Sequence, residues 1–385
     1  MKREIQGTVQ KSSLAAGEAY STYIPNPLPP SPPVELAEFA EWNRAAIAAF
    51  DALNDIVSAT SPDPSVITYM YIRKEAVLSS QIEGTQSTLD DLLRYESEQV
   101  IGVPAEDVEE VSSYVAALNH GLKRMQEGFP LSLRLIREIH KILLENSRGK
   151  TKSPGEFRTS QNWIGGSRPG NAHFVPAPPD KVPELMSGLE KFLHNEDIPP
   201  LILAALTHHQ FETIHPFLDG NGRAGRLLIT LFLCERGFLK SPFLYLSLFF
   251  KKNRDLYYEK LDSVRKTGDW EEWLNFFLEG VAVTATNART TLVAIQKLFE
   301  ADDFKISSLG RPRITASAVF NQFKRKPLLT ITELVDQTKL ARNTVISSVE
   351  RLISLDILRN VSEKKWGQIY SYSGYAELLV PDTEG

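Results

Sequence analysis

The sequence predicts a mostly α-helical protein with one short β-hairpin and a separate small module towards its C-terminal end. Apolar residues recur at helical spacing along most of residues 34–290. A stretch rich in glycine, proline, asparagine and aromatic residues interrupts this pattern at 161–179 and is the candidate hairpin. A polar segment containing glycine and proline follows Ser307 and indicates a linker, after which a different pattern begins.

Composition and length restrict the class of protein. A chain of 385 residues suggests two or three domains, and 42% hydrophobic with 24% charged residues is typical of soluble globular proteins. No apolar run approaches the roughly 18 residues of a membrane span, and the first residues lack a secretory signal pattern. The single cysteine, Cys234, excludes an internal disulfide. We therefore expect a cytoplasmic protein with no membrane partner.

The predicted elements divide the chain into three parts. Six prolines between positions 25 and 33 favour an extended arm before the first helix. Gly84 is placed to end one helix, and Ser87-Thr88-Leu89-Asp90 resembles a capping box that starts the next. Helices are expected from residue 34, at 66–83, from residue 87, and at 108–127, 131–146, 201–214 and 225–236. We predict an N-terminal part at 1–105, a core at 106–290 and a module at 306–385.

One loop, HPFLDGNGRAGR, begins at His215 and gathers the groups that phosphate chemistry needs. A helix is expected to begin near Asn221, where glycines, exposed N–H groups and the helix dipole favour a bound anion. Arg223 and Arg226 suit phosphate recognition, and Asp219 is a hard oxygen ligand suited to Mg²⁺ shared with phosphate oxygens. His215 is the one group here whose free pKa lies near neutral pH, so it can serve as a general base.

This loop matches the signature HPFx(D/E)GNGRxxR at every fixed position, and the chain resembles the Fic family over most of residues 34–285. The resemblance implies a Fic-type helical core that transfers AMP from ATP to a Ser, Thr or Tyr hydroxyl of a target protein or of itself. It implies that His215 deprotonates the hydroxyl, that Asp219 holds Mg²⁺, that Arg226 pairs with the γ-phosphate and that Arg223 supports the phosphates or the loop. The other implied phosphate-binding positions are Gly220, Asn221, Gly222, Ala224 and Gly225.

The helix that ends at Gly84 carries a second motif, which starts at Ser79. By itself, Glu83 at a helix C-terminus suggests a solvated charge. The segment SSQIEG, however, matches the Fic inhibitory pattern (S/T)xxxE(G/N) at every position. The resemblance implies that Glu83 pairs with Arg226 in place of the γ-phosphate, and arginine–carboxylate pairing is strong enough to compete there. We expect Ser79 to support Glu83 by a hydrogen bond.

Two further site assignments depend on the resemblance. Residues 161–179, hereafter the flap, resemble the Fic hairpin that aligns a target segment by backbone pairing. The flap residues assigned to target docking are Trp163, Ile164, Gly165, His173 and Phe174. Tyr258 matches the adenine-contacting tyrosine of the family better than Tyr257 does. Both tyrosines also lie at helical positions that are typical of a core, and this alternative remains open.

Three other interpretations of these residues compete with AMP transfer. His208, His209, Glu212 and His215 have a spacing compatible with a transition-metal site, but no HExxH pattern exists and Asp219 suits Mg²⁺. A transcriptional regulator could use a Fic-like core as a nucleotide sensor, although a sensor would not need His215. Finally, Glu83 could position water to remove AMP, and the sequence does not decide against this reversal.

The C-terminal part resembles a winged helix-turn-helix domain. A helix, a turn at 338–340, a second helix from Ala341 and strands near 357–361 and 368–371 make up this pattern. Residues 301–385 contain 12 Lys and Arg against 10 Asp and Glu, a weak electrostatic basis for DNA binding. DNA and protein therefore remain equal candidates as partners of this module, and self-association into an oligomer also remains open.

Overall fold

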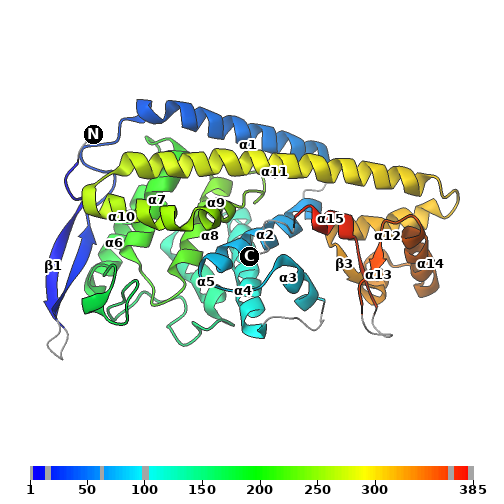
Figure 1. Ribbon diagram of the computed structural model, residues 1–385, viewed down its shortest axis with the longest axis horizontal. Helices are drawn as coiled ribbons and strands as arrows, with labels where there is room; N and C mark the ends of the chain where they lie inside the picture. The colour runs from blue at the N-terminus through cyan, green and yellow to red at the C-terminus, as the bar shows by residue number, and fades with distance from the viewer. Residues whose placement is uncertain (1–2, 14–18, 61–64, 98–103, 363–367, 380–385) are drawn as a thin grey trace.

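The computed structural model describes residues 3–13, 19–60, 65–97, 104–362 and 368–379 (Figure 1). Its α-helices are α1 Ala40–Thr60, α2 Ser65–Ile82, α3 Leu89–Tyr95, α4 Ala105–Gln126, α5 Leu133–Leu144, α6 Val182–Leu193, α7 Pro200–Ile214, α8 Asn221–Glu235, α9 Ser247–Lys252, α10 Arg254–Thr267, α11 Trp270–Ser307, α12 Arg313–Arg325, α13 Ile331–Thr338, α14 Arg342–Ser354 and α15 Ser373–Glu377. Its strands are β1 Gly7–Ser13, β2 Ala19–Pro25, β3 Leu328–Thr330, β4 Arg359–Asn360 and β5 Ile369–Ser371. Short 3-10 turns lie at Leu36–Phe39, Pro169–Asn171 and Pro179–Lys181. The prediction of a mostly helical protein is confirmed.

Helix α11 runs along the length of the molecule. Its 38 residues correspond to about 57 Å of helix, and α1 lies beside it (Figure 1). The first part of α11 packs on α7 and α10, and its last turns reach α12 and α15. The helix therefore continues through the boundary that the sequence analysis places at residue 290. Within the described residues, no helix is both long and apolar enough to cross a membrane.

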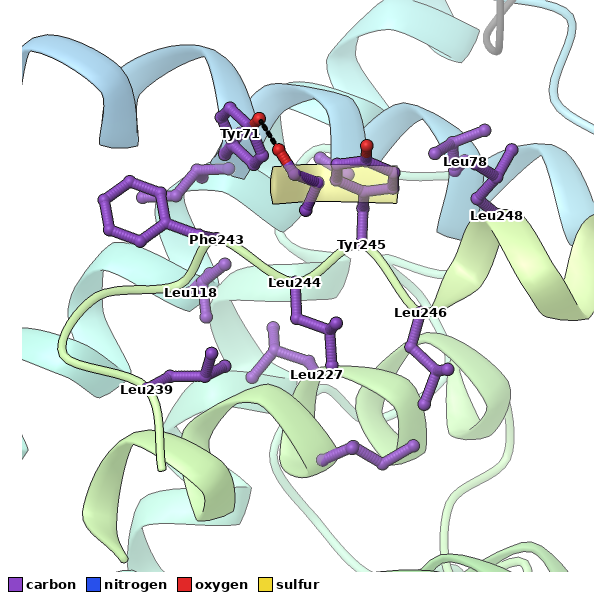
Figure 2. Close-up of a cluster of buried hydrophobic side chains, with 14 of the residues drawn as sticks. Tyr71, Leu78, Leu118, Leu227, Leu239, Phe243, Leu244, Tyr245, Leu246 and Leu248 are labelled. Atoms are coloured by element: carbon purple, nitrogen blue, oxygen red, sulfur yellow. Dashed lines mark hydrogen bonds between the residues drawn. The ribbon is translucent and has the colours of Figure 1, made fainter. Parts of the chain in front are cut away.

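An extended buried segment, residues 243–246, passes between α2 and α8 (Figure 2). The Phe243 ring meets the Tyr71 ring of α2 edge-on, with centroids 5.6 Å apart. The Tyr71 hydroxyl donates to the carbonyl oxygen of Ala288 in α11, and Leu227 of α8 lies below the segment. Helices α2 and α8 are thereby packed through one apolar layer, which positions the residues at their ends.

The predicted stop and start signals around Gly84 are confirmed. Helix α2 ends at Ile82, and Gly84 follows with φ +99°, a conformation that disfavours residues with a Cβ. The Thr88 side chain accepts from the backbone N–H of Asp91, whose carboxylate accepts from the Thr88 N–H. This capping box begins α3 and makes the turn that carries Glu83 short and well defined.

Strand pairing differs from the prediction. In the flap, the expected hairpin is reduced to one antiparallel bridge between Ile164 and Phe174, because several prolines lack the N–H groups that a longer ladder needs. The longer hairpin lies in the predicted extended arm, where β1 pairs antiparallel with β2 and places Gly7 opposite Pro25. Of the six prolines that suggested an extended arm, Pro25 is the last residue of this ladder and the other five follow it.

The C-terminal elements pack on the last turns of α11. Strands β3, β5 and β4 form an antiparallel sheet in that order, beside α12, α13 and α14. The predicted linker is a tight turn in which Gly310 has φ +67°. The Phe299 ring of α11 contacts Tyr372 and Tyr375. The expected polar turn between β4 and β5 includes residues 363–367, which lie outside the described residues.

One buried hydrogen bond should contribute measurably to the attachment of these elements. The Tyr372 hydroxyl donates to the carboxylate of Asp302 at 2.7 Å, and Asp302 is 2% exposed. Tyr372→Phe leaves a carboxylate oxygen of Asp302 buried without this partner, which should lower the free energy of unfolding by about 1–3 kcal/mol. Chemical denaturation will measure this loss. Tyr370→Phe is the control, because that hydroxyl bonds Gln368 beside the surface, and an equal loss there would contradict the assignment.

Candidate active site

His215 ends α7 in an unusual backbone conformation. Its φ of 51° and ψ of 61° are left-handed, which is uncommon for a residue with a side chain. Two side chains from the start of the flap region hold it there. Arg158 Nε donates to the His215 carbonyl oxygen at 2.9 Å, and Asn162 Nδ2 donates to the same atom at 3.2 Å. These bonds offset the local strain and fix the backbone from which the imidazole projects.

The loop is locked internally by Asn221, the first residue of α8. Its side-chain Oδ1 accepts from the Phe217 N–H at 2.8 Å, and its Nδ2 donates to the Phe217 carbonyl oxygen at 2.9 Å. Asn162 Nδ2 donates to the same carbonyl at 2.8 Å. Asn221 was predicted to line the phosphate site, but its amide is used to close the loop.

His140 of α5 supports the loop from outside the motif. Its ring stacks on Phe217, with centroids 3.6 Å apart and a 6° interplanar angle. Its Nδ1 accepts from the Gly155 N–H, so Nε2 carries the proton and donates to the Asp219 carbonyl oxygen at 2.9 Å. Burial lowers the pKa of His140 to about 4, which keeps the ring neutral. From the sequence, His140 is interpreted as a single, structural histidine, because nothing in the motif indicates that it supports the loop.

Glu83 and Arg226 meet between α2 and α8. Arg226 Nη2 donates to Glu83 Oε1 at 2.7 Å, although the two residues are 143 positions apart in the chain. The expected bond between Ser79 and Glu83 is not the one formed. Instead, Arg226 Nε donates to Ser79 Oγ and Arg226 Nη2 to the Ser79 carbonyl oxygen, both at 2.9 Å. Ser79 therefore orients the arginine, since a buried guanidinium needs acceptors for its other N–H groups.

The Glu83 carboxylate lies against the first turn of α8. A Cβ at Gly222 would overlap Glu83 Oε1, so only glycine admits the carboxylate here. The position is favourable for an anion, because the first N–H groups of a helix have no intrahelical partner. Burial opposes the charge of Glu83, but Arg226 and then Arg223 outweigh burial and hold its pKa below the usual value. The carboxylate thus occupies the anion position at this helix end.

Two further carboxylates lie near Arg226. Glu75 of α2 accepts from Ser247 Oγ at 2.5 Å, and burial raises its pKa to about 7. Glu212 of α7 lies one turn before the base, and burial also raises its pKa to about 7. A Cβ at Gly225 would overlap Glu212 Oε1, so this glycine accommodates a carboxylate rather than a phosphate. The neighbouring Ala224 is 4% exposed and packs in the core.

Arg223 takes a partner that the sequence analysis did not foresee. Its Nη1 lies 2.7 Å from Glu110 Oε1 of α4, and both side chains are nearly buried. Arg148 lies on the outer side, 3.7 Å from Glu110 and 3.0 Å from Asp107. Arg223 therefore forms an ion pair with a residue of α4 in this structure.

The charge state of His215 suits a base. Burial, followed by the charges of Arg265 and Arg158, lowers its pKa to about 4. Its Nδ1 lies 3.4 Å from the Glu212 carbonyl oxygen, so Nδ1 carries the proton and Nε2 keeps a lone pair. The imidazole is neutral at physiological pH and can accept a proton at Nε2. Asp219 is half-buried, and its Oδ1 accepts from the Gly220 N–H at 2.6 Å.

The two tyrosines of α10 separate into core and surface. Tyr257 is 1% exposed and its hydroxyl lies 2.8 Å from His208 Nε2, whereas Tyr258 is 38% exposed near Arg254. His209 Nε2 bonds the Leu261 carbonyl oxygen at 3.1 Å. Both histidines are thus engaged in the core. In the described parts of the chain, no three His, Cys, Asp or Glu side chains cluster as a metal site would require.

The assigned flap residues lie together around the single bridge. Ile164 and Phe174 exchange two backbone hydrogen bonds, of 2.8 Å and 3.1 Å. Gly165 has φ +69° and packs closely on His173, whose Nε2 contacts the Asp262 carboxylate. Trp163 is 38% exposed. Strand β2 extends this arrangement, because the Tyr23 N–H donates to the Val175 carbonyl oxygen at 3.0 Å.

Comparisons with known proteins agree with this arrangement. Residues 130–233 match the sequence model of the Fic/DOC family, and residues 42–123 match that of the Fic/DOC family N-terminal region. A protein adenylyltransferase Fic of Nematostella vectensis is 30% identical over 196 residues, which are 49% of this chain and 43% of the relative. Protein adenylyltransferase fic-1 of Caenorhabditis elegans is 33% identical over 116 residues, 29% of this chain and 21% of the relative. The chain thus spans less than half the length of these relatives.

Solved structures share the fold. A Fic family protein from Desulfovibrio desulfuricans G20 has a TM-score of 0.51 at 20% identity, covering 85% of this chain and 95% of that one. Residues 134–508 of Fic-1 from C. elegans give a TM-score of 0.52 at 25% identity, covering 68% and 74%. The matched segments include α2, which carries Glu83, and the loop from His215 to Arg226. The chain therefore carries a Fic/DOC domain at residues 130–233, preceded by the Fic/DOC N-terminal region at residues 42–123.

Proposed function

We propose that this protein transfers AMP from ATP to a Ser, Thr or Tyr hydroxyl of a target protein. The observation that carries the proposal is the presence, in one site, of a neutral, half-buried His215 and of an anion site formed by Arg226 and Glu83 at the start of α8. His215 lies at one end of the loop and the anion site at the other. A base and a phosphate site that act on one triphosphate must lie this close together. The names of the relatives, which are protein adenylyltransferases, support the same chemistry.

In the proposed reaction, His215 Nε2 takes the proton of the target hydroxyl. The hydroxyl oxygen forms a bond to the α-phosphorus of ATP, the bond from that phosphorus to the bridging oxygen breaks, and pyrophosphate leaves. The N–H groups at the start of α8 and the guanidinium of Arg226 stabilise the phosphate charge. Catalysis therefore depends on position and charge rather than on a covalent enzyme intermediate.

We propose Asp219 as the Mg²⁺ ligand. Its carboxylate is half-buried, and in the described part of the chain no lysine or arginine pairs with it. A single carboxylate is a suitable donor set, because Mg²⁺ binds through one or two carboxylates together with phosphate oxygens and water. The bound ion would neutralise phosphate charge. His140 contributes by fixing the backbone from which this carboxylate projects.

We further propose that Glu83 inhibits transfer. Its carboxylate holds the arginine that the γ-phosphate would use, and it lies against the N–H groups of α8. With the γ-phosphate displaced, the α-phosphorus is misaligned for attack. Removal of AMP by a water that Glu83 positions remains an alternative for the same groups.

The outer parts of the molecule carry the remaining proposals. The flap would align the target, and exposed Tyr258 would contact adenine. The elements α12 to α14 with the sheet β3-β5-β4 would act as a winged-helix module whose partner is DNA or protein. Cytoplasmic location, self-association and the three-part division of the chain stay predictions from the sequence.

His215→Ala should reduce the rate of AMP transfer by about 10²–10⁴-fold, because it removes the general base. Nucleotide binding should persist, since the phosphate groups contact other residues. Initial rates with α-labelled ATP, and calorimetry for ATP, will test both parts. The control is His194→Ala, an exposed histidine after α6. Transfer by His215→Ala at the control rate would contradict the assignment.

Asp219→Ala should reduce Mg²⁺-dependent transfer by roughly 10²-fold or more, because a metal supplies several kcal/mol of charge stabilisation. The rate should be titrated against Mg²⁺ concentration in both proteins. A variant whose rate and Mg²⁺ dependence equal those of the parent, or a parent that is insensitive to EDTA, would remove Asp219 from this role.

Glu83→Gly should raise the initial rate of AMP transfer by about a hundredfold, the scale on which a small misplacement of reacting groups acts. The reason is that Arg226 becomes available to the γ-phosphate. The double variant Glu83→Gly with Arg226→Ala should lose the gain. Rates of parent, single and double variants with α-labelled ATP provide the comparison.

A matched control for the substitution at the helix end is Glu127→Gly. It removes a glutamate after α4 that, among the residues the structure describes, pairs with nearby Lys123 and Arg124. This change should leave the transfer rate unaltered. If Glu83→Gly is folded, binds ATP and is no faster than the parent, Glu83 is not an inhibitor.

A further inference from the structure

Arg265 of α10 lies beneath the residues that immediately precede His215. It is 7% exposed, and its Nε donates to Thr213 Oγ1 at 3.1 Å while Nη2 donates to the Glu212 carbonyl oxygen at 3.3 Å. Its Nη1 pairs with Asp262 Oδ1 at 3.2 Å on the same helix. One guanidinium therefore holds the last turn of α7 against α10, without contacting the loop motif itself.

The same guanidinium also contacts the flap. Its Cζ lies 4.1 Å from the centroid of the Phe174 ring. Asp262, which pairs with Arg265, also contacts flap residue His173. Phe174 therefore contacts Arg265 directly and His173 is linked to it through Asp262, while Arg265 is bonded to the helix end that carries the base. A chain of direct contacts thus runs from the flap to His215.

An arginine is needed for this set of contacts. Its planar fork reaches three acceptors while one face stays on an aromatic ring, and a lysine ammonium cannot do both. Lys266, the next residue, provides a comparison. It contacts the same Asp262 at 3.2 Å, but its side chain is 66% exposed.

We propose that Arg265 is a positioning residue that couples the flap to the orientation of His215. The proposal rests on the proposed transfer reaction, in which the flap carries the target and His215 accepts the proton of its hydroxyl. Seating a target segment on the flap orders Phe174 and His173, and through Arg265 the end of α7. The base is thereby aligned when a target is present.

The pKa of His215 provides a second way to measure how Arg265 affects the base. The elements around His215 carry several ionisable groups, which are Glu83 after α2, Arg158 before the flap, Glu212 of α7, Asp219 of the loop, Arg226 of α8 and Arg265 of α10. Burial, then Arg265 and Arg158, lowers the pKa of His215. Removing the charge of Arg265 must therefore raise that pKa, whereas Arg265→Lys keeps the charge and loses the fork.

The test uses the full chain with Glu83→Gly as parent, combined with Arg265→Lys, Arg265→Met or the control Lys266→Met. We expect kcat for AMP transfer to fall about ten- to a hundredfold in both Arg265 variants, with the KM for ATP unchanged. NMR titration of the His215 imidazole should show a pKa rise of about one unit in Arg265→Met only. Lys266→Met should match the parent in both measurements.

The kcat and NMR measurements distinguish failure of the proposed AMP transfer from failure of the proposed role of Arg265. A Glu83→Gly parent that transfers no AMP contradicts the proposed function, while the imidazole titration still tests the electrostatic influence of Arg265 on His215. The coupling is overturned if kcat of the Arg265 variants stays within threefold of the parent, or if Lys266→Met has an equal effect. If Arg265→Met does not fold, Arg265→Lys decides, because parental kcat in that variant excludes a positioning role.

Discussion

The buried guanidinium of Arg226 is the group around which the site is arranged. A cation that is 2% exposed must find acceptors within the protein, because transfer from water without them is costly. Ser79 offers two oxygens and Glu83 a third, all from the last turns of α2. Helix α2 must therefore lie beside α8, and the apolar layer around residues 243–246 provides that packing.

The same cation accounts for the charge distribution around the site. Glu75 and Glu212 are buried near Arg226, and burial raises the pKa of both to about 7. Glu83, which bonds the arginine directly, has its pKa lowered instead. One cation cannot offset three neighbouring carboxylates in a buried setting, so the carboxylate in contact with it keeps its charge most readily.

Much of the loop geometry is imposed by residues that lie far from it in the sequence. His140 holds the Asp219 carbonyl, Arg158 and Asn162 hold the left-handed backbone of His215, and Arg265 holds the turn before it. His140, Arg158 and Arg265 belong to neither motif, and Asn162 lies in the flap without being assigned a role there, because the hydrogen bonds through which these residues act leave no periodic spacing in the sequence. The loop motif supplies the reactive groups, and these outside residues orient them.

The sequence by itself determined the helical class, the stop at Gly84, the capping box after it and the chemistry of the loop, because these features depend on contacts between residues a few positions apart. The pairing of Glu83 with Arg226 was also predicted, but only through the resemblance to a family motif. The tertiary structure decided that Ser79 bonds Arg226, that Arg223 forms an ion pair with Glu110 and that the long hairpin lies before residue 26. Such partners are chosen when distant helices pack, and local patterns of apolar and polar residues do not encode them.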